Sequence, residues 1–161
     1  MGTARILLLL GVAAAIQLRL ACNLLDGMVA IEGAKRTPYG DLYNDVPDRI
    51  ADVAIFLSAG YGIAYLPFGT VLGWSAALAA VLTAYVRLLG GSMGLTQYFS
   101  GPMAKQHRMA TLTGACAASV FEPLWGGRGQ MMEVALALIV AGSIAGFIRR
   151  LRLICREIAR Q

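Results

Sequence analysis

Acidic and amide side chains recur at helical spacing on both sides of one short polar segment. Asn23 and Asp26 are three residues apart at the end of an apolar run, so an α-helix places them on one face. A second set follows that segment and keeps to the helical repeat: Asp41, Asn44, Asp45, Asp48 and Asp52. If two helices meet at a short loop, the oxygen atoms of both sets converge on one site.

Such a site favours a hard divalent cation. An Asp at bilayer depth costs about 2.5–3.5 kcal/mol on insertion scales. Two carboxylates about 4 Å apart repel by about 4 kcal/mol at an effective dielectric constant of 20. A cation between the carboxylates reduces both costs, and oxygen ligands without Cys or His favour Mg²⁺, Mn²⁺ or Ca²⁺ over zinc. The alternative is that Asp41 and Asp45 are solvated loop charges and that Asp48 caps a helix.

The elements that carry these residues must lie in a membrane. Hydrophobic residues make up 58% of the chain and charged residues 14%, and the mean hydropathy is +0.65. A soluble domain carries about 25% charged residues, so this chain has too few to cover a globular surface. Runs of near-spanning length recur at Ile6–Leu25, Ile50–Phe68, Val71–Leu89, Met109–Trp125 and Met131–Ile148. We therefore predict an all-α, polytopic transmembrane bundle of about five spans that forms a single domain over residues 1–161.

The positive charges indicate an orientation rather than a nucleic-acid partner. Five arginines follow the last apolar run: Arg149, Arg150, Arg152, Arg156 and Arg160. If the spans alternate, these fall on the same side as Lys35, Arg36, Lys105 and Arg108, which the positive-inside rule makes cytoplasmic. Only Arg5 and Arg128 fall on the other side. The three widely spaced cysteines support neither a disulfide framework nor a zinc site.

The polar residues also match a longer motif. The stretch resembles the CDP-alcohol phosphatidyltransferases, whose motif reads D-x2-D-G-x2-A-R-x8-G-x3-D-x3-D. Its fixed positions correspond in order to Asn23, Asp26, Gly27, Ala30, Ile31, Gly40, Asn44 and Asp48. Every spacing fits, although Asn replaces Asp at positions 23 and 44 and Ile replaces Arg at position 31. The family has six helices, so the resemblance implies one more helix before the first span seen here.

The resemblance implies a role for each matched position. Members of the family join a CDP-linked lipid, commonly CDP-diacylglycerol, to an alcohol and release CMP. The implied metal ligands for Mg²⁺ or Mn²⁺ are Asn23, Asp26, Asn44 and Asp48. Asp48 is also the implied catalytic base, which takes the proton of the attacking hydroxyl. The implied CDP-binding residues are Gly27, Ala30 and Gly40, whose small side chains let the nucleotide approach the helices.

The two asparagines change the charge of the site. Each keeps a carbonyl oxygen that can bind a metal but removes one negative charge relative to Asp. Two such changes would weaken the binding of a pair of metal ions or leave only one ion tightly bound. Asp41 or Asp45 could compensate by lying close to Asn44.

Three basic residues resemble acceptor-binding residues of the family. Arg87 ends the third span, and Lys105 and Arg108 open the fourth, where they could hold the phosphate or polar head of an acceptor. The alternatives are that Arg87 is a snorkelling anchor and that Lys105 and Arg108 only obey the positive-inside rule.

Together these observations predict a transferase of phospholipid biosynthesis. Its partners would be a CDP-diacylglycerol-like donor, an alcohol acceptor and the lipid bilayer, without nucleic acid, and the resemblance suggests a homodimer. We expect it in the bacterial inner membrane with its site facing the cytoplasm. The alternatives are a catalytically silent membrane homologue that acts as a subunit and a divalent cation transporter that uses the acidic residues.

Overall fold

The computed structural model describes residues 3–32, 40–95 and 103–159. Within these ranges, the side chains at positions 3–5, 26–27, 29–32, 40–41 and 44 lie outside the described part. The elements are α1 (Thr3–Glu32), α2 (Gly40–Gly62), α3 (Gly69–Ser92), α4 (Lys105–Phe121), a 3₁₀ turn (Glu122–Trp125) and α5 (Gln130–Ile158). The described residues form no strand, which confirms the predicted all-α bundle.

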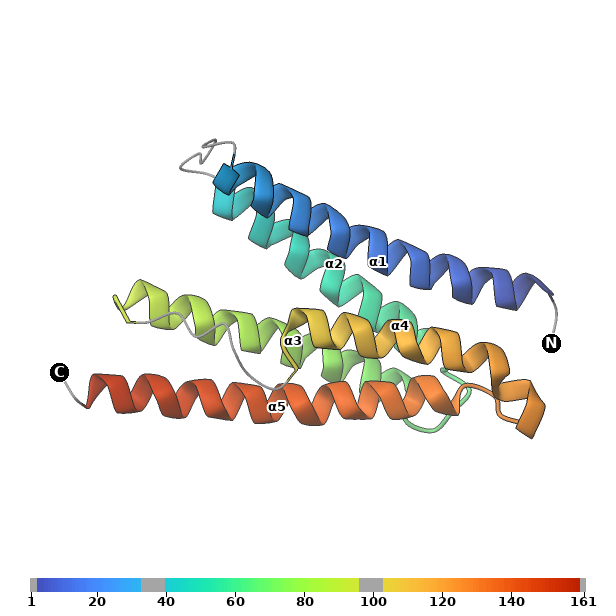
Figure 1. The fold of residues 1–161 in the computed structure, drawn as a ribbon. Helices are drawn as coiled ribbons and strands as arrows, with labels where there is room; N and C mark the ends of the chain where they lie inside the picture. Colours follow the sequence, from blue (N-terminus) through green and yellow to red (C-terminus); the bar gives the residue numbers. More distant parts are fainter. Residues whose placement is uncertain (1–2, 33–39, 96–102, 160–161) are drawn as a thin grey trace.

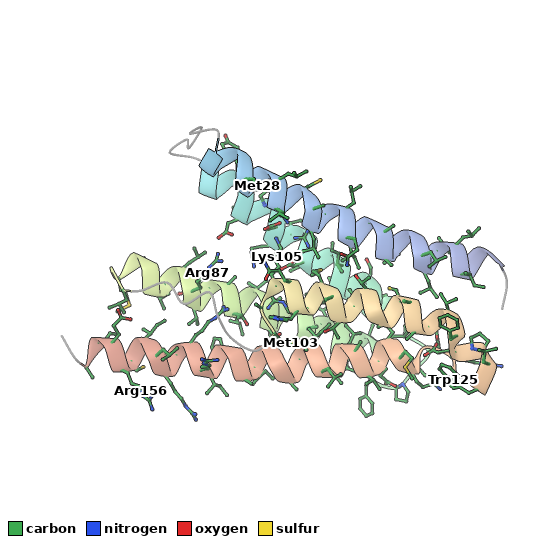
Figure 2. The ribbon with its side chains drawn as sticks, in the orientation of Figure 1. Met28, Arg87, Met103, Lys105, Trp125 and Arg156 are labelled. Atoms are coloured by element: carbon green, nitrogen blue, oxygen red, sulfur yellow. The ribbon has the colours of Figure 1, made fainter. Side chains whose placement is uncertain are left out.

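Successive helices run in opposite directions along one bundle (Figure 1). Helix α3 packs against α2 and α5, whereas α4 packs against α1 and α5. Helix α1 lies on the outside and crosses the bundle at an angle (Figure 1). The C-terminal ends of α1, α3 and α5 and the N-terminal end of α2 therefore lie toward the same end of the bundle, whereas α4 starts nearer its middle (Figure 1). Arg156 and Trp125 lie at opposite ends (Figure 2).

Three described helices are long and apolar enough to cross a membrane. They contain the segments Ile6–Leu25, Gly69–Ser92 and Gln130–Ile158. Helix α2 carries several charges in its first half, and α4 has only 17 residues, so neither meets the same measure. Large apolar side chains such as Leu8, Trp74 and Leu138 remain exposed, as lipid-facing positions do. The chain is a helical membrane protein.

Several predicted helix ends differ from the structure; α1, for example, continues to Glu32, beyond its apolar run of residues 6–25. Helix α2 begins at Gly40 and ends at Gly62, whereas its apolar run covers residues 50–68. Helix α5 continues to Ile158, ten residues beyond its predicted end. An apolar run indicates only the part of a helix that contacts lipid. The helix itself can continue beyond that run where its polar residues face protein or water. Asp48 therefore lies inside α2 rather than at its cap, which corrects that alternative.

Helices α2 and α3 approach closely at a pair of glycines. A methyl group on Gly60 would lie 2.7 Å from the Cα atom of Gly73, and one on Gly73 would lie 2.9 Å from the carbonyl oxygen of Phe56. Small residues allow such backbone contact between membrane helices. This contact fixes the crossing of α2, whose first half carries the acidic residues.

A buried carboxylate fixes the end of the bundle opposite the acidic residues. Glu122 is fully buried and accepts hydrogen bonds from the backbone N–H groups of Gly129 and Met131, each at 2.6 Å. These amides belong to the first turn of α5, where a negative charge also interacts favourably with the helix dipole. Gly126 and Gly129 in the same connection have positive φ angles of 75° and 98°, which glycine tolerates.

Candidate functional site

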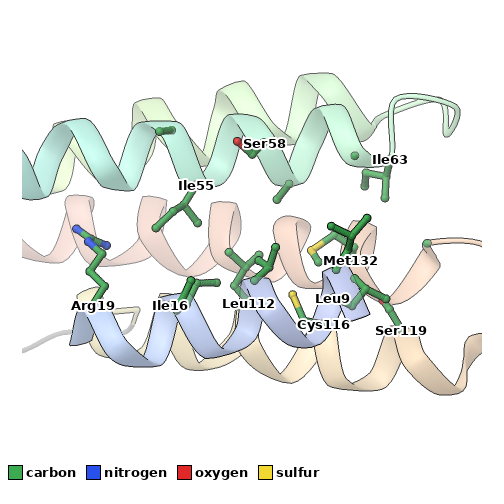
Figure 3. Close-up of a pocket in the computed structure, with 17 residues that line it drawn as sticks. Leu9, Ile16, Arg19, Ile55, Ser58, Ile63, Leu112, Cys116, Ser119 and Met132 are labelled. Atoms are coloured by element: carbon green, nitrogen blue, oxygen red, sulfur yellow. The ribbon is translucent and has the colours of Figure 1, made fainter. Parts of the chain in front are cut away.

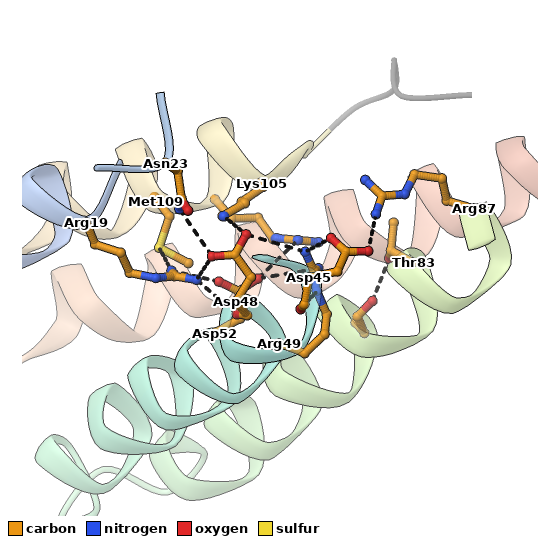
Figure 4. Close-up of polar contacts among 12 residues, drawn as sticks. Arg19, Asn23, Asp45, Asp48, Arg49, Asp52, Thr83, Arg87, Lys105 and Met109 are labelled. Carbon is orange, nitrogen blue, oxygen red and sulfur yellow. Dashed lines mark hydrogen bonds and ion pairs between the residues drawn. The ribbon is translucent and has the colours of Figure 1, made fainter. Parts of the chain in front are cut away.

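Asp48 lies where three helices meet (Figure 4). Its Oδ1 atom accepts hydrogen bonds from Asn23 Nδ2 at 3.1 Å and from Arg19 Nη2 at 3.0 Å, both on α1. Its Oδ2 atom pairs with the Lys105 ammonium at the start of α4 and lies 4.0 Å from Arg49 Nη2. Asn23 and Asp48 are the two ends of the predicted motif, and the fold brings them into contact.

Asp52 lies one turn further along α2 and is only 1% exposed. Its Oδ1 atom accepts a hydrogen bond from Arg19 Nη1 at 2.8 Å. Its Oδ2 atom lies 3.8 Å from Arg49 Nη1 and 3.8 Å from Arg108 Nη2, and it has no hydrogen bond within the described part of the chain. The buried charge of Asp52 is thus compensated by guanidinium groups on three helices.

Asp45 lies at the other end of the same stripe on α2. Its Oδ2 atom accepts a hydrogen bond from Arg87 Nη2 of α3 at 2.8 Å, and its Oδ1 atom lies 3.6 Å from Arg49 Nη2. Asp45, Asp48 and Asp52 therefore share one face of α2, as the spacing predicts.

A cavity of about 240 Å³ adjoins this acidic face, and its charged lining is entirely basic. The cationic side chains come from four helices: Arg49, Arg87, Lys105, Arg108 and Arg150. Arg108 is only 3% exposed, and its Nε and Nη1 atoms have no hydrogen-bond partner among the described residues. Arg150 donates a hydrogen bond to the carbonyl oxygen of Thr83 at 2.9 Å. The cavity is suited to an anionic group with several acceptor oxygens.

The surroundings of Asp48 and Arg108 shift their pKa values without changing their charge near neutral pH. Burial raises the pKa of Asp48, but the hydrogen bond and charge of Lys105, the Asn23 hydrogen bond and the charge of Arg19 lower it below its ordinary value. Burial lowers the pKa of Arg108 to about 10, although the charge of Asp52 opposes this. Asp48 is therefore a carboxylate and Arg108 a cation in neutral solution.

The structure brings together some of the predicted site residues. Asn23, Asp48 and Lys105 are in direct contact, and Lys105, Arg87 and Arg108 line the basic cavity. The side chains of the other predicted residues lie outside the described part of the chain: Asp26, Gly27, Ala30, Gly40 and Asn44. Their predicted roles in binding metal and CDP therefore stay predictions.

The sequence interpretation did not identify three arginines that belong to the site. Arg19 contacts both Asp48 and Asp52, Arg49 lies beside all three carboxylates, and Arg150 lines the basic cavity. Arg19 could have been identified from the sequence, because a charged residue well inside an apolar span is the starting point for a functional hypothesis. Arg150 could not be told apart from the four other arginines at the C-terminus, which follow the positive-inside rule.

A second, apolar cavity of about 600 Å³ lies between α1, α2, α4 and α5 (Figure 3). Its lining includes Leu9, Ile16, Ile55, Leu112 and Met132. Arg19 lines its end nearest the polar site (Figure 3). This apolar lining suits an acyl chain, while both Nη atoms of Arg19 donate to Asp48 and Asp52.

The described residues are a poor match for a metal ion at Asp48. Both carboxylate oxygens of Asp48 already pair with cationic side chains, so a divalent ion there would have to displace Arg19 or Lys105. Asn23 directs its amide nitrogen toward Asp48. Asp26 and Asn44 complete the predicted ligand set, and their side chains are outside the described part of the chain.

Comparison with known proteins supports the membrane assignment. The chain is 31% identical over 97 residues to the inner membrane protein YnbA of Escherichia coli strain K12. The match covers 56% of this chain and 44% of YnbA, so the chain spans less than half the length of that relative. No family model and no solved structure matches the chain. The chain is thus similar to an inner membrane protein, in agreement with its three long apolar helices.

Proposed function

We propose that the chain is a CDP-alcohol phosphatidyltransferase. It transfers a phosphatidyl group from a CDP-linked lipid such as CDP-diacylglycerol to an alcohol and releases CMP. The observation that carries this proposal is the hydrogen bond between Asn23 and Asp48, which are 25 residues apart in sequence. The motif requires these two positions to share a site, and their contact agrees with that requirement.

In the proposed reaction, the acceptor hydroxyl oxygen attacks the lipid-linked phosphorus atom. The bond from that phosphorus to the CMP oxygen breaks, CMP leaves with the bonding electrons, and the hydroxyl proton passes to Asp48. The three donors that hold Asp48 fix its direction, and the acceptor hydroxyl must replace one of them to reach it. Lys105 is the best suited to move, because its long side chain is flexible.

The two cavities support binding of both substrates. The apolar cavity would take the acyl part of the donor. The basic cavity would take an anionic or polar group of the acceptor, through Arg87, Lys105 and Arg108. A bound Mg²⁺ or Mn²⁺ ion would neutralise charge on the diphosphate, with Asn23, Asp26 and Asn44 as the proposed oxygen ligands.

We further propose the bacterial inner membrane as the location, with the site facing the cytoplasm. Arg156 lies at one end of the bundle and Trp125 at the other, with Lys105, which contacts Asp48, between them (Figure 2). The excess of basic residues toward the Arg156 end supports a cytoplasmic orientation of that end. The name of the relative YnbA supports the inner membrane.

The proposal is tested by lipid synthesis in membranes that contain the chain. Membranes receive CDP-diacylglycerol labelled in its acyl chains and a panel of alcohols, and new lipids are identified by mass spectrometry. We expect one new labelled phospholipid, which Asp48→Asn reduces by about a hundredfold or more because the base is lost. Glu133→Gln makes the same charge change in the first turn of α5, at the other end of the bundle, and should retain activity.

A catalytically silent membrane subunit is the second candidate. It is favoured by the pairing of both Asp48 oxygens with cations and by the two asparagines in the motif. The same membranes distinguish the two functions. A folded chain that makes no labelled product with any alcohol supports the silent subunit.

A further inference from the structure

Arg19 occupies an unusual place for a cation. It lies within the apolar segment Ile6–Leu25 of α1, where a charged side chain costs about 2.5–3.5 kcal/mol on insertion scales. Its side chain is 18% exposed and reaches across to α2 (Figure 4). This free-energy cost must be offset by a strong interaction between the Arg19 guanidinium and a partner of opposite charge.

The partners of Arg19 are the two inner carboxylates of the acidic face. Nη1 donates to Asp52 Oδ1 at 2.8 Å, and Nη2 donates to Asp48 Oδ1 at 3.0 Å and to the Asp48 carbonyl oxygen at 2.9 Å. Asp48 and Asp52 are four residues apart on one helix face, where like charges repel. The guanidinium bridges both carboxylates, which is the position a divalent cation would take between them.

The charge around these carboxylates is already balanced by the protein. Four cationic side chains lie within 4.0 Å of Asp48 or Asp52: Arg19, Arg49, Lys105 and Arg108. Arg19 donates hydrogen bonds to both carboxylates, whereas Arg49 and Arg108 lie 3.8–4.0 Å away and Arg49 also lies 3.6 Å from Asp45. Among the described residues, Arg19 is therefore the cation that occupies the space between Asp48 and Asp52.

The asparagine at position 23 fits the same arrangement. Its neutral amide donates to the Asp48 oxygen that Arg19 also contacts. A carboxylate in its place would bring a third negative charge to about the same distance and would require a further cation. A neutral residue at position 23 therefore suits a site in which Arg19 supplies one positive charge where a divalent ion would supply two.

We propose that Arg19 is a built-in substitute for one divalent cation, so that the chain binds at most one such ion and Asp48 is not among its ligands. This rests on the proposed function and assigns a positioning role to Arg19, which fixes the direction of the Asp48 carboxylate through its hydrogen bonds. The prediction that Asp48 is a metal ligand is replaced, whereas its role as base is kept.

The test counts bound Mn²⁺ on the purified full-length chain in lipid nanodiscs by electron paramagnetic resonance. We expect no more than one Mn²⁺ per wild-type chain. Arg19→Gln exposes two carboxylates and should bind one more Mn²⁺ than wild type, displaceable by Mg²⁺. Arg19→Lys keeps the charge and should bind the wild-type number. Arg128→Gln removes an exposed arginine at the other end of the bundle and should also leave the number unchanged.

Two results would overturn the proposal. One is a wild-type chain that binds two Mn²⁺ ions, which can be read without any variant and so does not depend on how well Arg19→Gln folds. The other is a folded Arg19→Gln chain with an unchanged number of bound ions, which would reduce Arg19 to a link between α1 and α2. If the ion numbers are as expected but no CMP is released, the transferase proposal fails while the role of Arg19 stands.

Discussion

At the scale of single residues, the site is defined by how its carboxylates are paired. Asp48 accepts from Asn23, Arg19 and Lys105, and Asp52 is enclosed by three arginines. These contacts pair both groups with cations in a part of the molecule where unpaired charge is costly. The same contacts restrain the direction of Asp48, which a proton acceptor requires.

The pairing of Asp48 predicts a pH-dependent contribution to stability. Its folded pKa lies below its ordinary value of 3.8, so its carboxylate form stabilises the fold above about pH 4. This stabilisation is lost as the pH falls through the folded pKa. Thermal unfolding of wild type and Asp48→Asn, followed by circular dichroism with chelator present, should differ most near neutral pH. The difference should shrink below about pH 4, and a constant difference from pH 7 to pH 3 would contradict the pairing.

At the scale of helices, the position of the acidic face depends on the contact between α2 and α3. Gly60 and Gly73 bring the two backbones together below the site, and Phe56 is fully buried beside them. Helix α2 is therefore held against α3 by its apolar half, while Asp48 and Asp52 in its polar half contact side chains of α1 and α4.

A single methyl group at this contact should destabilise the bundle. Gly73→Ala places a Cβ atom 2.8 Å from the Cα atom of Gly60 and 2.9 Å from the Phe56 carbonyl oxygen, and neither backbone can move freely. We expect a loss of about 1–3 kcal/mol in unfolding free energy, measured by denaturant titration in detergent. Gly114→Ala is the matched control in α4, because its added Cβ atom meets nothing within 4 Å. Equal stability of the two variants would contradict the close contact.

Helix type and order could be predicted from the sequence, but helix ends and contacts between distant residues could not. Apolar runs indicate each span because lipid selects for them. They miss the first ten residues of α2 and the last ten of α5, where polar residues face protein or water. The stripe of Asp45, Asp48 and Asp52 could be predicted because the helical repeat is local. The partners Arg19 and Arg150 depend on how α1 and α5 pack, which spacing within one helix does not determine.

At the scale of the whole molecule, charge is separated along the bundle. Arg156 of α5 lies at one end and Trp125 at the other, with Lys105 of the polar site between them (Figure 2). The buried Glu122 belongs to the same 3₁₀ turn as Trp125. This asymmetry agrees with a membrane protein whose site faces the more basic side.

The orientation can be measured with single cysteines. Because the described chain contains Cys22, Cys116 and Cys155, these are first changed to Ser or Ala. We then expect a cysteine at the exposed Leu124 to react with a membrane-impermeant maleimide in intact cells. A cysteine at the exposed Ala159 should react only after the inner membrane is opened. Reaction in the reverse order would place the site outside the cytoplasm.

The central claim is that the site around Asp48 and Asn23 catalyses phosphatidyl transfer. The release of CMP tests this claim most directly. The purified chain in lipid nanodiscs receives CDP-diacylglycerol labelled in cytidine, together with Mg²⁺ and the alcohol panel, and labelled CMP is measured over time. The account predicts alcohol-dependent CMP release by the wild-type chain and a loss of about a hundredfold or more in Asp48→Asn. Release at the same rate by folded Asp48→Asn and wild type would contradict it, as would no release from a folded wild-type chain.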